Sequence, residues 1–324
     1  MNPVCAKFAS GDFSSLVDAF GRAGFAVREP AAGVLQIMGG TDPDRMRLLV
    51  SVGVHGDETA PIEIVALLLE QLAREPAALQ VDLMIVIGNI EAIAQGKRFI
   101  DVDLNRLFVA NRVQFNDSKE ASRADQLMDL SAEFFARHPR NWHLDLHTAI
   151  RASHYPTFAI VPGRYNASFV SWLGRAGILA AVLNPEGAVT YSAYTCHHLG
   201  ATSCTAELGR IGVMGTNDLS QFTVTSEALH SLLRGELTDQ AGLDATTHPL
   251  VFQVTQELIK RSDAFQLTFD GNTENFTRFA PHAVVATDSD LQYRVGDQPE
   301  YVLFPNQTVR VGLRAGLMVR RVDT

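Results

Sequence analysis

The first part of the chain alternates short apolar runs with longer segments of helical periodicity. These runs predict a buried strand at Val81–Ile87 and further strands at Leu35–Met38, Leu48–Val54, Trp142–Leu146, Phe158–Val161, Ala180–Leu183 and Ser203–Leu208. Apolar residues spaced three and four positions apart predict helices at Ile62–Ala73, Ser118–Arg137, Ser168–Ala176 and Phe222–Leu233. Because strands alternate with helices, we expect an α/β fold with a mostly parallel mixed sheet and helices on both faces.

Two segments of this part have local features of their own. Thr59 and Pro61 precede the first predicted helix, and their types predict an N-cap and a proline in the first turn. Lys97–Val109 mixes charged and apolar residues without a period, which predicts a loop.

The pattern changes after about Gly235. Glu236–His248 is polar and predicts a linker. Beyond it, short apolar runs separated by turn residues predict strands at Val251–Ile259, Ala264–Phe269, Ala283–Thr287, Tyr301–Phe304, Val309–Leu313 and Leu317–Val322. We therefore expect an α/β domain over residues 1–240 and a small C-terminal β domain over residues 241–324, which we expect to narrow the entrance of a pocket.

Three side chains that can bind a metal stand where predicted strands end. His55 follows Leu48–Val54 and lies three positions before Glu58, and His147 follows Trp142–Leu146. In parallel sheets, ligands gather at the carboxyl ends of the strands, so these residues can share one site. Two imidazoles and one carboxylate are typical of hydrolytic zinc, since they leave a coordination position for water.

Composition and charge exclude several classes of function. The 324 residues are 46% apolar and 19% charged, which predicts a sizeable core. A formal net charge of −9 argues against a surface that binds nucleic acid or an anionic membrane, although a local arginine cluster could still bind an acidic substrate. No apolar run approaches the roughly 20 residues of a membrane span, and the N-terminus lacks a signal-peptide pattern. We therefore expect a cytoplasmic protein.

The cysteines and glycines add no further site. Cys5, Cys196 and Cys204 are too few for a disulfide framework, and the last two are too far apart for a thiolate zinc site. The sequence contains no glycine-rich phosphate-binding motif in the right context, so a nucleotide cofactor is not expected.

Together these residues resemble the succinylglutamate desuccinylases, in the aspartoacylase branch of the zinc carboxypeptidase-like enzymes. The resemblance is carried by residues 55–61 (HGDETAP), 95–98 (QGKR), 105–106 (NR), 143–151 (HLDLHTAIR), 205–209 (TAELG), 217–219 (NDL), 300–306 (EYVLFPN) and 312–318 (GLRAGLM). It spans nearly the whole chain, and the segment DLHTAIR favours the desuccinylases over the aspartoacylases themselves. It implies a zinc carboxypeptidase-like fold.

The resemblance also implies an activity and a metal. The reaction would be hydrolysis of the amide bond of N-succinyl-L-glutamate to succinate and L-glutamate, in arginine catabolism by the succinyltransferase route. His55, Glu58 and His147 would hold one Zn2+ ion per chain, which would activate water and polarise the carbonyl. Glu207, near the end of Ser203–Leu208, would be the general base and then return the proton to the amine. Taken alone, it would be an exposed glutamate at a strand end.

The implied substrate carries three carboxylates, so we expect arginines to line its pocket. By the resemblance, Arg98 would face the scissile carbonyl, and Asn105 and Arg106 would bind a substrate carboxylate, for which the planar arginine fork is suited. Taken alone, both arginines could be solvated loop cations. The chain departs from the pattern of the family that it resembles at two positions. Asp57 stands where asparagine is common, and His197 stands where related aspartoacylases have an arginine, so the residue that binds the distal succinyl carboxylate stays open.

Several alternatives remain open from the sequence. Asp145 lies on the same strand face as His147 and either accepts a hydrogen bond from that imidazole or pairs with a core arginine. The same chemistry would serve an aspartoacylase-like N-acyl-amino-acid deacylase or a zinc carboxypeptidase. A zinc-stabilised binding module would need four protein ligands, and only three are found. The expected partner is a small anionic acyl-amino acid, with no nucleic acid and no membrane, and a homo-oligomer is left open.

Overall fold

The computed structural model describes residues 2–40, 42, 44–110, 112, 115–184, 188–236 and 248–322. The α-helices are α1 (Pro3–Ala9), α2 (Ser14–Arg22), α3 (Ala60–Leu72), α4 (Ile90–Gln95), α5 (Lys119–Phe135), α6 (Ala167–Arg175), α7 (Tyr191–Leu199) and α8 (Thr223–Leu233). Short 3-10 helices are η1 (Pro76–Ala78), η2 (Leu104–Arg106) and η3 (Leu219–Phe222). Within these residues, no helix is both long and apolar enough to cross a bilayer.

The strands form two sheets. Before the segment 237–247 they are β1 (Ala26–Ala31), β2 (Val34–Met38), β3 (Arg47–Val52), β4 (Asp82–Ile87), β5 (Asn141–Ala149), β6 (Phe158–Pro162), β7 (Ala180–Asn184) and β8 (Thr202–Arg210). After it they are β9 (Leu250–Ile259), β10 (Gln266–Leu267), β11 (Thr277–Phe279), β12 (Val284–Asp288), β13 (Leu291–Arg294), β14 (Glu300–Leu303) and β15 (Arg314–Arg321). The large sheet has the order β1-β2-β4-β3-β5-β8-β6-β7-β9-β15-β14-β11, and the small sheet has the order β10-β12-β13.

The centre of the large sheet is parallel and its two ends are antiparallel. Strands β4, β3, β5 and β8 run parallel to one another, whereas β1 and β2 add to them in antiparallel fashion. Strand β6 is antiparallel to β8, and β7 and β9 then run parallel to β6. Continuous apolar strands such as β4, which is buried along its whole length, suit a sheet covered on both faces. The predicted α/β class with a mixed sheet and a small C-terminal β part is confirmed.

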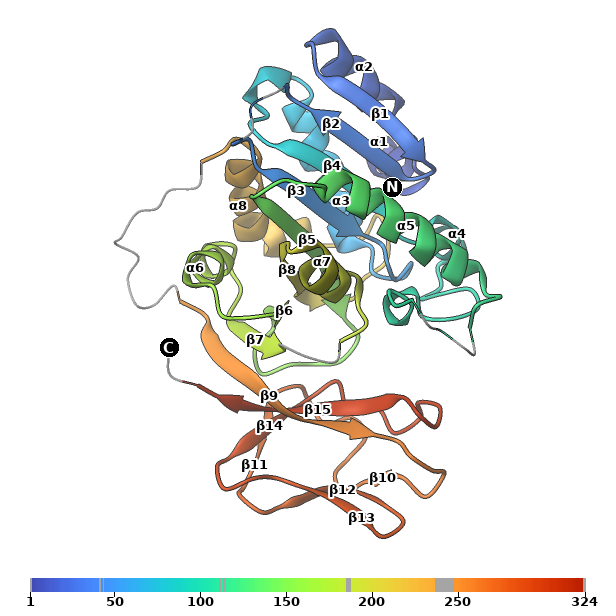
Figure 1. Ribbon diagram of the computed structural model, residues 1–324, viewed down its shortest axis with the longest axis vertical. Helices are drawn as coiled ribbons and strands as arrows, with labels where there is room; N and C mark the ends of the chain where they lie inside the picture. The colour runs from blue at the N-terminus through green and yellow to red at the C-terminus, as the bar shows by residue number, and fades with distance from the viewer. Residues whose placement is uncertain are drawn as a thin grey trace.

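Helices cover both faces of the central strands, as Figure 1 shows. Successive side chains of a strand point to opposite faces, and β3 follows this rule. Leu48 and Val50 pack in the core formed with α1, α2, α3, α6 and α8, whereas Leu49 packs in the core formed with α5 and α7. The sheet is thereby fixed in position, and the carboxyl ends of β3, β5 and β8 meet at one edge.

Four of the C-terminal strands, β9, β15, β14 and β11, extend the large sheet. Strand β9 pairs with β7 at its beginning and with β15 along most of its length. Figure 1 shows the resulting β unit below the α/β part, with β10, β12 and β13 as a second layer. The expected boundary between residues 240 and 241, and most of the predicted linker, lie outside the described residues. The division into two domains stays a prediction.

Several sequence-based predictions need correction. His147 lies inside β5 and not after it, because the strand continues to Ala149, which pairs with Arg210 of β8. Thr59 does occupy the N-cap position of α3, with Pro61 in the first turn, but its hydroxyl makes no capping hydrogen bond and donates to the carbonyl of Gly212 over 2.9 Å instead.

The other differences concern short or weakly patterned segments. Val309–Leu313 forms turns and no strand, and of Ala264–Phe269 only Gln266–Leu267 is a strand. The loop Lys97–Val109 contains the short helix η2. The elements that the pattern did not predict are α1, α2, β1, α4, α7, β11 and β13.

Candidate metal centre

The loop between β3 and α3 is held tightly, and this fixes His55 and Glu58 in place. A Cβ at Gly56 would collide with the backbone of Ala92 and Ile93 in α4, so only glycine fits there. The Gly56 amide also donates a hydrogen bond to the carbonyl of Arg98 over 3.1 Å. The same packing therefore brings His55, Glu58 and Arg98 to one edge of the sheet.

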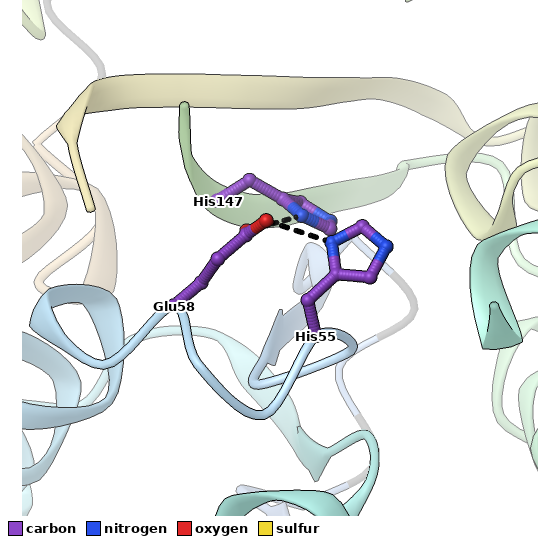
Figure 2. A group of neighbouring side chains, drawn as sticks. All are labelled: His55, Glu58 and His147. Atoms are coloured by element: carbon purple, nitrogen blue, oxygen red, sulfur yellow. Dashed lines mark hydrogen bonds and ion pairs between the residues drawn. The ribbon is translucent and has the colours of Figure 1, made fainter. Parts of the chain in front are cut away.

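His55, Glu58 and His147 converge on a single point. Nδ1 of His55 lies 2.8 Å from Oε1 of Glu58, and Nδ1 of His147 lies 2.8 Å from Oε2 of Glu58. Figure 2 shows both imidazoles turned toward this carboxylate. Their candidate ligand atoms all lie within 4.8 Å of one another, and all three side chains are buried. The structure thus brings the predicted ligands together from a loop and from β5.

An aspartate lies against the outer nitrogen of each imidazole. Nε2 of His55 is 2.9 Å from Oδ1 of Asp103, and Nε2 of His147 is 2.9 Å from Oδ2 of Asp145. This arrangement orients a ligand imidazole and fixes which nitrogen faces the metal. Asp145 therefore lies against the ligand imidazole as an ion-pair contact, while its Oδ1 atom accepts a hydrogen bond from the hydroxyl of Ser51 over 2.6 Å. Asp103 was missed, because it lies in the loop without periodicity and only its place two residues before Asn105 could have indicated it.

The charges around the ligands favour a cation between them. Burial opposes the charge of Glu58, but His55 and His147 hold the pKa of this carboxyl well below its usual range. Burial also opposes the charge of His147, but Asp145 and Glu58 raise the pKa of that imidazole well above its usual value. The pocket therefore stabilises positive charge beside the Glu58 carboxylate. Two imidazoles and a carboxylate with this surrounding field fit a divalent zinc ion.

Glu207 lies in β8, in register with His147 of the neighbouring strand β5. Its side chain is buried, and its Oε2 atom has no hydrogen-bond partner among the described residues. Burial, followed by the negative charge of Glu58, raises the pKa of Glu207 to about 7. A carboxyl group with such a pKa can both take up and release a proton near neutral pH.

The predicted substrate-binding residues line the same cavity. Nη1 of Arg98 donates to Oε1 of Glu58 over 2.7 Å, which places this guanidinium beside the metal ligands. Oδ1 of Asn105 accepts a hydrogen bond from the backbone amide of Tyr191 over 2.9 Å. Within the part of the chain that the structure describes, the side chain of Arg106 makes no hydrogen bond or ion pair. Its guanidinium is thus available to a ligand.

The cavity has a volume of about 790 Å³ and lies between the α/β part and the C-terminal β unit. Residues of the β unit such as Leu313 and Arg314 form part of its wall. The arginines that line it are Arg98, Arg106, Arg151, Arg210, Arg310 and Arg314. An acidic protein therefore has a cationic cavity next to its candidate metal ligands, as the implied substrate requires.

The two residues that depart from the family pattern, His197 and Asp57, differ in how close they lie to the cavity. His197 is exposed and does not line the cavity, so it does not replace the missing arginine as a ligand for a distal carboxylate. Asp57 is closer to the site, with Oδ1 4.0 Å from Nη1 of Arg98, and burial raises its pKa. Its Oδ1 atom has no hydrogen-bond partner within the described ranges.

Comparisons with known proteins show which family the chain resembles. The family model described as the succinylglutamate desuccinylase/aspartoacylase catalytic domain matches residues 44–233, and the one described as the AstE/AspA barrel-sandwich hybrid domain matches residues 247–322. A succinylglutamate desuccinylase of Burkholderia lata is 42% identical over 307 residues, which cover 93% of this chain and 84% of that protein. A succinylglutamate desuccinylase of Paraburkholderia xenovorans is 42% identical over 295 residues, which cover 89% of this chain and 85% of that protein.

Solved structures show the same relationship. The succinylglutamate desuccinylase of Chromobacterium violaceum has a TM-score of 0.80 at 34% identity, with 98% of both chains covered. That of Vibrio parahaemolyticus has a TM-score of 0.83 at 30% identity, with 95% of both chains covered. Murine aminoacylase 3 shares the fold at a TM-score of 0.54 and 20% identity. The chain belongs to the succinylglutamate desuccinylase/aspartoacylase family.

Proposed function

We propose that the chain is a zinc-dependent amidohydrolase that splits N-succinyl-L-glutamate into succinate and L-glutamate. The observation that carries the proposal is the convergence of His55, Glu58 and His147 beside the buried carboxyl group of Glu207. The relatives named above support the substrate, since the chain covers most of their length. Arginine catabolism by the succinyltransferase route, which the resemblance implies, is part of this proposal.

Each side chain has a role that follows from its position. A zinc ion held by His55, Glu58 and His147 would activate a water molecule and polarise the scissile carbonyl. Glu207 takes a proton from the attacking water and delivers it to the leaving amine nitrogen, and its pKa of about 7 suits both transfers. Arg98 lies beside the ligands and stabilises negative charge on the carbonyl oxygen, where one lost donor typically costs about 3 kcal/mol.

The remaining polar residues of the cavity bind the acidic groups of the substrate. Asn105 and Arg106 bind one carboxylate of the substrate. The guanidinium of Arg106 is available for it. The side-chain carbonyl of Asn105 already accepts a hydrogen bond from the first residue of α7, which fixes the orientation of this side chain. The charge-assisted hydrogen bonds of a guanidinium fork give both affinity and orientation. Orientation matters because the scissile amide must lie within reach of both the metal and Glu207.

A comparison of substrates tests the proposal directly. The purified chain loaded with zinc is incubated with N-succinyl-L-glutamate, N-acetyl-L-aspartate or a short peptide, and release of the free amino acid is measured. We expect the highest kcat/KM for N-succinyl-L-glutamate. Preference for acetylaspartate would indicate an aspartoacylase-like deacylase, and cleavage of the peptide would indicate a carboxypeptidase. Absence of turnover on all three would contradict the proposal.

A further inference from the structure

Arg314 brings a cationic side chain from the C-terminal β unit into the cavity. It is the first residue of β15 and is in register with Ile259 of β9, so its position is set by the sheet. Its side chain is only 17% exposed and lies in the cavity wall. One Nη atom lies 3.3 Å from Oε1 of Glu257, which is a single hydrogen bond to one carboxylate oxygen.

Arg106 of η2 and Arg314 of β15 both line the cavity and act on each other electrostatically. Burial, followed by the positive charge of Arg106, lowers the pKa of Arg314 to about 10. Glu257 and, more weakly, Asp103 offset part of this charge. The guanidinium of Arg106 itself makes no hydrogen bond or ion pair within the described part of the chain. The guanidinium of Arg106 thus has no hydrogen-bonded anion among these residues, and that of Arg314 bonds one oxygen of Glu257, so a bound carboxylate would add a charged partner to both.

We propose that Arg314 binds the side-chain carboxylate of the amino-acid half of the substrate, next to the carboxylate bound by Arg106. This rests on the proposed function in that the ligand is an N-acyl-glutamate. The β unit then contributes a group that selects the substrate, in addition to a wall that narrows the cavity.

The choice of carboxylate follows from the layout of the cavity. Arg98 marks the end at which the scissile carbonyl lies, because it contacts Glu58. Arg106 and Arg314 line the same cavity and act on each other electrostatically, and neither contacts Glu58 among the described residues. In N-succinyl-L-glutamate the two carboxylates of glutamate are joined by a short aliphatic chain, whereas the succinyl carboxylate lies across the scissile bond. A pair of adjacent cations therefore matches the glutamate half.

A comparison of two substrates with two enzymes tests this assignment. N-succinyl-L-glutamine has the shape of the substrate but a neutral amide in place of the side-chain carboxylate. We expect the wild type to favour the glutamate compound in kcat/KM by about 30-fold, as for one charge-assisted hydrogen bond. In Arg314→Gln, KM for the glutamate compound rises about 30-fold, KM for the glutamine compound hardly changes, and the preference disappears.

Matched variants separate this role from a structural one. Arg314→Lys keeps the charge and restores part of the preference. Glu257→Gln removes the ion pair of Arg314 but leaves the cation, so it raises KM far less than Arg314→Gln. Glu257→Gln could reproduce the full rise in KM, or Arg314→Gln could lower kcat/KM equally for both compounds. In either case Arg314 is a structural residue and the proposal is wrong. Arg320→Gln removes an exposed charge from the same strand and is the control.

A binding measurement keeps this proposal distinct from the proposed function. Dissociation constants for the glutamate and glutamine compounds are measured by calorimetry on zinc-loaded Glu207→Gln, with and without Arg314→Gln, and need no turnover. If the wild type hydrolyses neither compound, the proposed function fails while this binding ratio still decides on Arg314. A ratio near one with Arg314 present would overturn the proposal. The proposal would also be overturned if Arg314→Gln changed only the preference for N-succinyl-L-glutamate over N-acetyl-L-glutamate. Arg314 would then bind the carboxylate of the succinyl group.

Discussion

His147 and Glu207 stand in register on the neighbouring parallel strands β5 and β8. One turns an imidazole nitrogen toward Glu58, and the other has a buried carboxyl oxygen without a hydrogen-bond partner among the described residues. Because both are fixed by strand pairing, their separation does not depend on loop motion. A metal ligand and a proton-transferring group are thus positioned by the same two elements.

The first prediction concerns Glu207. In Glu207→Gln the shape of the side chain is kept but proton transfer is lost, so we expect kcat to fall about 1000-fold with zinc still bound. Steady-state kinetics and metal analysis on the same sample check both parts. Glu133→Gln, which removes an exposed carboxylate on α5, should behave as the wild type. Full activity of Glu207→Gln would reject this residue as the general base.

The second prediction concerns the aspartates behind the imidazoles. Asp103→Asn and Asp145→Asn keep the size of each side chain but weaken its hold on His55 or His147. We expect zinc affinity to drop about 10- to 100-fold in each variant. Competition with a fluorescent chelator measures this affinity, and Asp129→Asn on the exposed face of α5 serves as the control. Unchanged affinity would show that the contacts do not orient the ligands.

The third prediction concerns the stability of the metal-free chain in acid. His143 is fully buried between Ser51 and Thr195, with Asp145 and His147 acting on it in opposite directions. Burial lowers its pKa to about 4 from an ordinary 6.5. Between these values the unfolded chain binds a proton that the folded chain does not, so the free energy of unfolding falls as the pH drops.

Over this window His143 accounts for a loss of at most about 3 kcal/mol. Urea unfolding between about pH 7 and about pH 4 spans the two pKa values of His143. It measures the loss of unfolding free energy in the wild type and in His143→Gln. The difference between the two curves isolates His143 from other titrating groups. We expect a shallower decline in the variant. Parallel curves would mean that His143 does not set the acid sensitivity.

Much of the candidate site could be predicted because its signals are local. The spacing of His55 and Glu58 is visible in the sequence, and Trp142, Leu144 and Leu146 alternate in the way that predicts the strand carrying His147. Parallel strands bring their carboxyl ends together, so a shared site followed from the α/β pattern. The exposed strand-end interpretation of Glu207 is wrong, because β6 and β5 both pair with β8 there and bury the side chain.

Other features depend on contacts that no local pattern encodes. Asp103 lies in an irregular loop and meets His55 only after folding. Arg314 lies far along the chain and reaches the cavity because β9 and β15 extend the sheet. The failed strand prediction at Val309–Leu313 has a related cause, since apolar residues there line the cavity instead of pairing with a neighbour.

The central claim is that His55, Glu58 and His147 together hold one zinc ion with a position left open. X-ray absorption at the zinc edge, with metal analysis on the same sample, tests it most directly. We predict one zinc per chain with nitrogen and oxygen ligands only, and loss of the metal in His147→Ala. Retention of one zinc per chain by His147→Ala, or a sulfur ligand in the spectrum, would contradict the account.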